Sequence, residues 1–208
     1  METYLSFLLF ASVLAAAPGP DTFLTLRASV VGGRRRGLVT MTGITTAGAL
    51  QGLLAATGLG AVLAASEPVF LTIRWAGVAY LTWLGITAMR DALRRDGSVW
   101  AVAGDAPQVR VRARAAFRQG FFCNITNPKV LAFNIAVLPQ FVSDGQGLAA
   151  LLAYAMTLVV VGAVVLLAVV QLGSVAARHL TRSRVRRSVD GATGVVMLGF
   201  ATALAVEA

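Results

Sequence analysis

The sequence predicts an all-α integral membrane protein with six transmembrane helices. Hydrophobic residues make up 57% of the chain and charged residues only 13%, whereas charged residues approach a quarter of a typical soluble domain. The apolar stretches extend over about 20 residues, the length that a helix needs to cross ~30 Å of hydrocarbon. No stretch alternates apolar and polar residues as the strands of a membrane barrel do. We therefore interpret residues 1–208 as a single transmembrane domain.

Six apolar stretches define the expected spans. They cover residues 3–26, 38–65, 69–89, 120–142, 148–172 and 189–206. Short polar turns connect the second span to the third and the fourth to the fifth. Residues 90–119 form the long loop between the third and fourth spans.

Basic residues orient these spans in the membrane. Apart from Arg74 and Lys129, the 18 Lys and Arg residues fall in three alternate segments, 27–36, 90–118 and 178–187. The loops and termini of the opposite face contain only acidic charges. By the positive-inside rule the basic loops, 90–119 included, are cytoplasmic and both termini are outside. The net charge of +9 then reflects contact with anionic lipid, and no nucleic-acid partner is expected.

Two proline motifs, residues 18–20 and 127–128, interrupt the first and fourth spans. Proline lacks an N–H and its ring collides with the carbonyl one turn earlier, so each motif ends one half-helix and begins another. Asn127 is the expected N-cap of the second new half-helix. An ionisable residue follows each break. The candidate substrate-binding and coupling residues are Asp21, Lys129, Pro18, Gly19, Pro20, Asn127 and Pro128.

Topology places Asp21 and Lys129 at a similar depth. At about 1.5 Å of rise per residue each lies ~10–13 Å inside the cytoplasmic boundary. Charge at this depth is costly and persists mainly along a polar pathway. A zwitterionic amino acid would suit the pair, with its carboxylate on Lys129 and its ammonium on Asp21. The substrate would then replace an internal ion pair, and Asp21 would take up a proton as Lys129 turned to the substrate.

Two structural alternatives stay open at this point. Asp21 and Lys129 would form a closed ion pair that only joins two spans, or Asp21 would only cap its half-helix. Other polar residues are candidates for lining a pathway, although such residues often hydrogen-bond between helices instead. They are Thr45, Thr46, Gln51, Asn124 and Asn134.

The chain contains no pattern typical of an enzyme. Cys123 and His179 are each the only residue of their type, and no catalytic motif or nucleotide-binding P-loop is present. We therefore expect no catalytic residue, cofactor or metal site, and transport driven by an ion gradient. The alternative functions are a metal or small-ion transporter of related architecture, which would need clustered acidic, Cys or His ligands, and a membrane scaffold.

Six spans divide into two sets of three. Because each set contains an odd number of spans, the second set crosses the membrane in the opposite orientation to the first. This arithmetic predicts a 3+3 inverted repeat, in which the proline-broken first and fourth helices are equivalent. Strict inversion would match residues 18–20 with Pro139 rather than with Pro128.

Four ordered motifs carry a family resemblance. Ala-Pro-Gly-Pro-Asp-Thr-Phe-Leu (17–24), Gly-Arg-Arg-Arg-Gly-Leu (33–38), Asn-Pro-Lys (127–129) and Leu-Pro-Gln-Phe (138–141) resemble the LysE/RhtB amino-acid exporter family. The resemblance covers the whole chain. It implies a secondary transporter in the bacterial inner membrane that exports amino acids against proton entry.

The Pro-Gly-Pro-Asp form of the first motif looks like the homoserine, threonine and leucine branches rather than the lysine branch. The resemblance therefore implies a neutral substrate. Which amino acid is exported, the coupling stoichiometry and whether the chain forms a homo-oligomer stay open.

Overall fold

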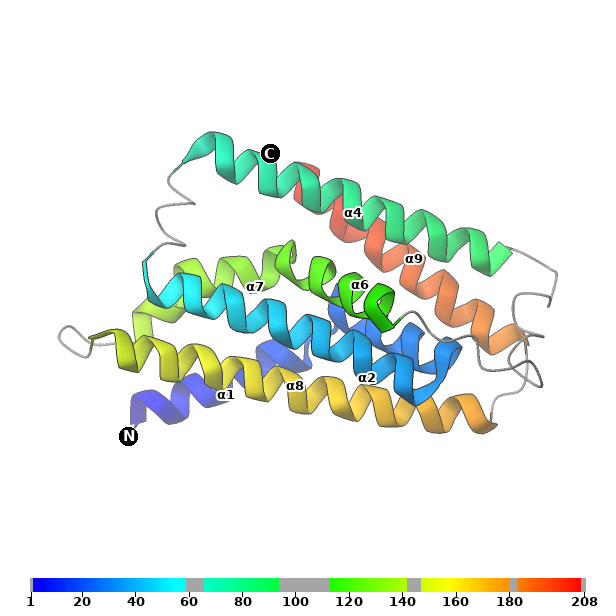
Figure 1. Cartoon of the computed structure of the whole chain (residues 1–208), viewed down its shortest axis with the longest axis horizontal. Helices are drawn as coiled ribbons and strands as arrows, with labels where there is room; N and C mark the ends of the chain where they lie inside the picture. The colour runs from blue at the N-terminus through cyan, green and yellow to red at the C-terminus, as the bar shows by residue number, and fades with distance from the viewer. Residues whose placement is uncertain (1, 59–65, 94–112, 142–146, 180–182, 207–208) are drawn as a thin grey trace.

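The computed structural model describes residues 2–58, 66–93, 113–141, 147–179 and 183–206. All regular structure in these ranges is helical, which confirms the predicted all-α class (Figure 1). The α-helices are α1 (Glu2–Ala16), α2 (Pro20–Ala56), α4 (Glu67–Leu93), α6 (Ala113–Ile125), α7 (Pro128–Ala132), α8 (Gly147–His179) and α9 (Ser183–Val206). A π-helix, η1 (Phe133–Val137), and a 3-10 helix, η2 (Leu138–Phe141), follow α7.

Three of the described helical stretches are long and apolar enough to cross a membrane. They are Pro20–Ala56, Gly147–Val175 and Arg187–Val206. Most of the expected cytoplasmic loop, residues 94–112, and the end of the expected second span, residues 59–65, lie outside the described residues.

Helix α2 is a helical hairpin that reverses direction at Gly33. This glycine has φ 75° and ψ 174°, a left-handed conformation that a side chain would strain. The chain turns back at this point (Figure 1), and the two halves touch where Gly37 packs against Ser29. The arginines expected in a connecting loop, Arg34 to Arg36, are therefore helical. Because arginine is a good helix former, the helix resumes directly after Gly33, and the turn needs only this one glycine.

The second half of α2 lies at the centre of the bundle, against α6 and α8, while α4 packs along α9 (Figure 1). Two glycines allow the closest crossing. A Cβ atom on Gly43 would collide with the backbone carbonyl of Phe117, and one on Gly120 with that of Thr40. Small residues let membrane helices approach in this way.

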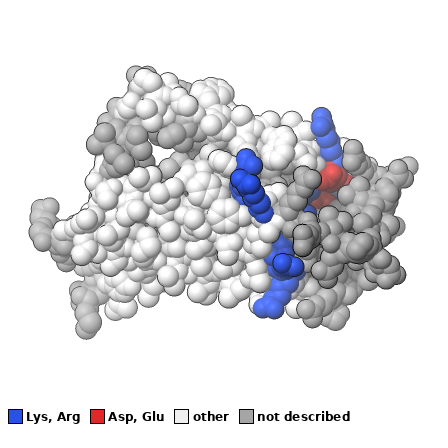
Figure 2. Space-filling model, viewed as in Figure 1, with Lys and Arg blue, Asp and Glu red and all other residues white. Residues whose placement is uncertain are grey.

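Two clusters of buried apolar side chains complete the packing. One joins α2, α4, α6 and α9, and the other joins α1, η1, η2 and α8. The first contains Leu24, Leu81, Leu84, Cys123, Met197 and Ala201, and the second contains Phe7, Ala11, Phe133, Leu138 and Ala155. On the face shown in Figure 2, the described charged side chains lie to one side of the centre, and the described residues of the other half are uncharged (white).

The second half of the expected fourth span is not one regular helix. Helix α7 ends at Ala132 and the chain continues through the π-turns of η1 and the 3-10 turns of η2. Pro139 lies in η2, where its missing N–H and its ring disfavour an α-helical bond to the preceding turn. A π-helix followed by a 3-10 segment absorbs this disruption. The sequence did not predict this second irregularity.

We expect Gly120→Val to destabilise the fold, because the side chain would overlap the α2 backbone at the Gly43 crossing. Overpacking of this kind typically costs ~1–3 kcal/mol. Thermal unfolding of the purified protein in detergent would measure the loss. Gly199→Val is the matched control, since a Cβ atom at Gly199 meets nothing within 4 Å. Equal melting temperatures for the two variants would contradict the close crossing.

Candidate functional site

The two predicted helix breaks meet inside the bundle. Helix α2 begins at Pro20, so Asp21 lies in its first turn, as expected. Asn127 is the N-cap of α7, because its side-chain oxygen accepts a hydrogen bond from the backbone N–H of Lys129 at 3.1 Å. This confirms the predicted cap. The amide Nδ2 of the same Asn127 donates to Oδ2 of Asp21 at 2.8 Å.

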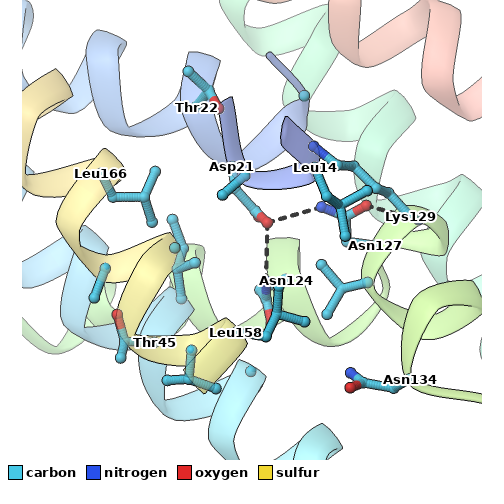
Figure 3. A pocket seen from close by; sticks show the side chains of 18 residues that line it. Leu14, Asp21, Thr22, Thr45, Asn124, Asn127, Lys129, Asn134, Leu158 and Leu166 are labelled. Atoms are coloured by element: carbon cyan, nitrogen blue, oxygen red, sulfur yellow. Dashed lines mark hydrogen bonds between the residues drawn. The ribbon is translucent and has the colours of Figure 1, made fainter. Parts of the chain in front are cut away.

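A second amide binds the same carboxylate oxygen. Asn124, near the end of α6, donates from Nδ2 to Oδ2 of Asp21 at 2.9 Å (Figure 3). The other oxygen, Oδ1, is buried without a hydrogen-bond partner. Buried polar atoms are nearly always hydrogen-bonded, so an orphaned carboxylate oxygen calls for an explanation. Two neutral amides hold Asp21 in place through one oxygen and leave the other without a partner.

Lys129 is held apart from Asp21. Its Nζ donates to the carbonyl oxygen of Ala17 at 2.7 Å, a backbone group in the break before α2. The ion pairs in the described part of the chain do not include one between Asp21 and Lys129. The expectation of an internal Asp21–Lys129 pair, whether closed permanently or exchanged for substrate, is therefore wrong for this conformation. Lys129 instead binds a backbone carbonyl, and Asp21 binds two side-chain amides, so each charge has its own neutral partners.

Both residues border a cavity of about 100 Å³. Since a cavity needs roughly 10–15 Å³ to hold one water, this cavity has room for more than one. Seven of the predicted site residues line it, from both breaks and from α2 and η1. They are Gly19, Asp21, Thr45, Asn124, Asn127, Lys129 and Asn134.

Other predicted residues lie around this cavity. Gln51 is buried and donates from Nε2 to the backbone carbonyl of Asn124 at 2.9 Å, while its Oε1 accepts from Nδ2 of Asn134 at 3.4 Å. It therefore positions two cavity residues. Thr46 is exposed and donates to the carbonyl of Thr42 at 2.8 Å, so its side chain lies away from the cavity.

The prolines shape the first break. Pro18 is exposed, whereas Pro20 is buried at the first position of α2. Pro128 occupies the equivalent first position of α7. These positions suit a residue without an N–H, because the first N–H groups of a helix have no partner within it.

Unpartnered polar atoms gather at the cavity. Besides Asp21 Oδ1, the side-chain oxygens Oδ1 of Asn124, Oδ1 of Asn134 and Oγ1 of Thr45 are buried without hydrogen-bond partners. All four residues line the cavity. The oxygens of Asp21, Asn124 and Asn134 can only accept hydrogen bonds. Lys129, which also lines the cavity, supplies a cation. The residues around the cavity thus combine unpartnered acceptors with a positive charge.

The sequence did not identify the apolar wall of this cavity. It consists mainly of α8 residues, namely Leu158, Val159, Gly162, Ala163 and Leu166. Helix α8 is apolar around most of its circumference, so periodicity could not show which side faces the cavity. The only local signal was a glycine, Gly162, in the middle of an apolar run.

The sequence also missed a second charged cluster. Arg27 was expected in a loop, but it lies within α2 and binds two carboxylates. Its Nε donates to Oδ1 of Asp190 in α9 at 2.7 Å, and its Nη2 donates to Oδ2 of Asp91 in α4, also at 2.7 Å. Asp190 is 0% exposed and Arg27 12% exposed. This ion triad joins α2 to the α4–α9 pair.

No group of three or more His, Cys, Asp or Glu that could hold a metal ion occurs in the described parts of the chain. Cys123 is buried beside the site and makes no disulfide.

Residues 12–208 match the family described as LysE type translocator. The chain belongs to this family. The resemblance that the four motifs carried is thus confirmed, and the protein is a membrane protein of the translocator class. No solved structure matches it significantly.

Curated relatives of this LysE type translocator cover most of the chain. The homoserine/homoserine lactone efflux protein of Salmonella typhimurium is 34% identical over 79% of this chain and 77% of its own length. The leucine efflux protein of Klebsiella pneumoniae is 28% identical over 97% of this chain and 94% of its own. The threonine efflux protein of Escherichia coli is 26% identical over 94% of this chain and 93% of its own length. These names support the branch expected from the Pro-Gly-Pro-Asp motif.

We expect Arg27→Gln to destabilise the protein, because it removes a cation that binds the fully buried Asp190. Removing one partner of a buried ion pair costs on the order of 3 kcal/mol. Thermal unfolding in detergent would measure the change, with Arg35→Gln as the control because Arg35 is exposed. If both variants melted at the wild-type temperature, the triad would not hold α2 to α4 and α9.

Proposed function

We propose that this protein is a secondary exporter of neutral amino acids in the bacterial inner membrane, driven by proton entry. One observation carries the proposal: a cavity at the meeting of two helix breaks holds an unpartnered carboxylate oxygen and a lysine ammonium. These are the complements of the two charges of an amino acid. The efflux proteins among its relatives act on homoserine, leucine and threonine, by their names.

Asp21 is the proposed partner of the substrate ammonium. A primary ammonium has three N–H donors, and three residues that line the cavity, Asp21, Asn124 and Asn134, each carry a buried acceptor oxygen without a partner. The substrates in the relatives' names share an α-ammonium, and homoserine lactone keeps it although its carboxyl group is closed into a ring. The ammonium is therefore the group that a common site would bind first.

Lys129 is the proposed partner of the substrate carboxylate. It would leave the carbonyl of Ala17, a neutral acceptor, for a charged one, and charge-assisted hydrogen bonds are the stronger kind. The first turn of α2 adds to this field. Gly19, its N-cap, has no side chain to satisfy the free N–H groups there, and a helix N-terminus favours a nearby anion.

Asp21 also supplies a route to proton coupling. When the substrate ammonium leaves, the two amides that bind the buried carboxylate are neutral and cannot compensate its charge, and an uncompensated charge at membrane depth is costly. A proton would neutralise Asp21 for the return step. The substrate ammonium and the proton would thus occupy the same carboxylate in turn, so that proton entry drives export of the amino acid.

The packing supports six spans arranged as a 3+3 inverted repeat. In such a repeat, α1 with the first half of α2 corresponds to α6 with α7, and each of these spans is broken near its middle. The second half of α2 would correspond to α8, and α4 to α9. Each of these two pairs packs together extensively, as expected for elements around a two-fold axis.

The charge distribution supports an orientation with both termini outside. The described charged side chains lie to one side of the centre in Figure 2, and the N-terminus lies toward the opposite end in Figure 1. The basic segments would face the cytoplasm, where Lys and Arg are enriched in short loops.

We expect Asp21→Asn to lower amino-acid counterflow in proteoliposomes at least about tenfold, equivalent to ~1.4 kcal/mol of lost substrate binding. The variant keeps the shape of the side chain and removes its charge. Accumulation driven by a proton gradient should disappear, because an amide cannot carry the proton. The measurement is uptake of radiolabelled threonine, homoserine and leucine, with and without the gradient.

Arg35→Gln serves as the control, since it removes an exposed charge outside the cavity. Unchanged flux and unchanged proton coupling in Asp21→Asn would contradict the proposed role of Asp21. Wild-type vesicles that exchange no amino acid but accumulate a divalent metal would instead favour a metal transporter.

A further inference from the structure

The wall of the cavity opposite the charged residues is an apolar face of α8. Leu158, Gly162 and Leu166 follow one another at intervals of four residues, so they share one face of the helix. In Figure 3, Leu166 lies across the cavity from Lys129. A substrate whose main-chain charges are held by Asp21 and Lys129 would direct its side chain toward this face.

Gly162 leaves a gap between the two leucines. It borders the cavity, and a Cβ atom built on it would meet nothing within 4 Å. The space in front of Gly162 is therefore open to a ligand and would be filled by any larger residue. The cavity as a whole, of about 100 Å³, has room for more than one water and so for a small ligand.

Thr45 supplies a polar group at this apolar wall. Most described threonine hydroxyls donate to a backbone carbonyl about one turn earlier, including those of Thr42, Thr46, Thr157 and Thr202. The Thr45 hydroxyl has no such bond and is buried. Thr25 and Thr40 are also buried without a partner, but among these three only Thr45 lines the cavity. Thr45 therefore borders the cavity with a hydroxyl group whose hydrogen bond is unused.

We propose that Thr45 and the α8 face around Gly162 form the side-chain subsite, which selects a short neutral side chain that carries a hydroxyl group. Gly162 limits the size of the side chain, and Thr45 binds its hydroxyl. This inference rests on the proposed function, because Asp21 and Lys129 must first fix the main-chain charges. The lining of α8 contains no charged residue, so a cationic side chain would be buried there without a partner.

Counterflow in proteoliposomes tests the hydroxyl contact. Threonine and homoserine are compared with 2-aminobutyrate, which has the same carbon chain as either and lacks the hydroxyl. We expect the wild type to prefer both hydroxylated substrates, and Thr45→Val to reduce this preference about tenfold, since a site that bonds a hydroxyl discriminates strongly against its absence. Thr46→Val is the matched control, because Thr46 is adjacent in sequence but exposed.

A second pair of variants tests the size limit. We expect Gly162→Leu to reduce transport of threonine and homoserine about tenfold relative to glycine and alanine, because the new side chain would occupy their space. Gly199→Leu, at an equally open helical glycine, should leave the ratio unchanged. If Gly162→Leu does not fold, as judged by size-exclusion chromatography, Gly162→Ala provides a smaller step with the same expected direction.

Failure of the subsite and failure of the proposed function give different results. A wild type that exchanges amino acids, together with unchanged ratios in Thr45→Val and in the Gly162 variants, overturns the subsite and leaves amino-acid export intact. A wild type that exchanges no amino acid overturns both. A changed ratio in Thr46→Val or Gly199→Leu of the same size as in its partner variant also overturns the subsite.

Discussion

The carboxylate of Asp21 connects the two interrupted helices, and the arrangement of the site depends on this connection. Asn124 and Asn127, on either side of the second break, donate to the same oxygen of Asp21 in the first turn after the first break. Asn127 also caps α7, so one side chain fixes both the new helix and the acid. The amides satisfy half of the carboxylate, and the other oxygen stays available at the cavity.

Helix α2 links this site to the rest of the bundle. Asp21 and Arg27 lie on the same half of the hairpin, six residues or ~9 Å apart along its axis. The first faces the cavity, and the second binds Asp91 of α4 and Asp190 of α9. The other half of α2 crosses α6 at Gly43 and Gly120 without intervening side chains. The position of the carboxylate is therefore set by contacts of α2 with α4, α6 and α9.

The local features of this site could be predicted from sequence because they depend on local chemistry. Proline and its flanking residues define both breaks and the Asn127 cap, and charges in apolar spans point to Asp21 and Lys129. The partners could not be predicted, since they depend on how separate helices approach. Lys129 binds the carbonyl of Ala17 rather than Asp21, and only the fold shows that this carbonyl is the nearer acceptor.

Two other features, the helical position of Arg27 and the apolar wall of the cavity, could not be predicted from sequence for physical reasons. Arg27 looked like a loop residue because a basic cluster follows it, whereas a single glycine at position 33 makes the whole turn. The apolar wall formed by α8 could not be predicted from the sequence, because a helix that faces lipid on one side and an apolar cavity wall on the other has no polar periodicity. Burial, not sequence pattern, separates Thr45 at the cavity from the exposed Thr46.

The most direct test of this account is competition for the site by a substrate whose ammonium has been blocked. Counterflow of labelled threonine would be measured with an excess of unlabelled threonine or of N-acetylthreonine, which keeps the carboxylate and the side chain but has no positive charge. If Asp21 binds the substrate ammonium, threonine competes and N-acetylthreonine does not. Equal competition by the two compounds would contradict the account.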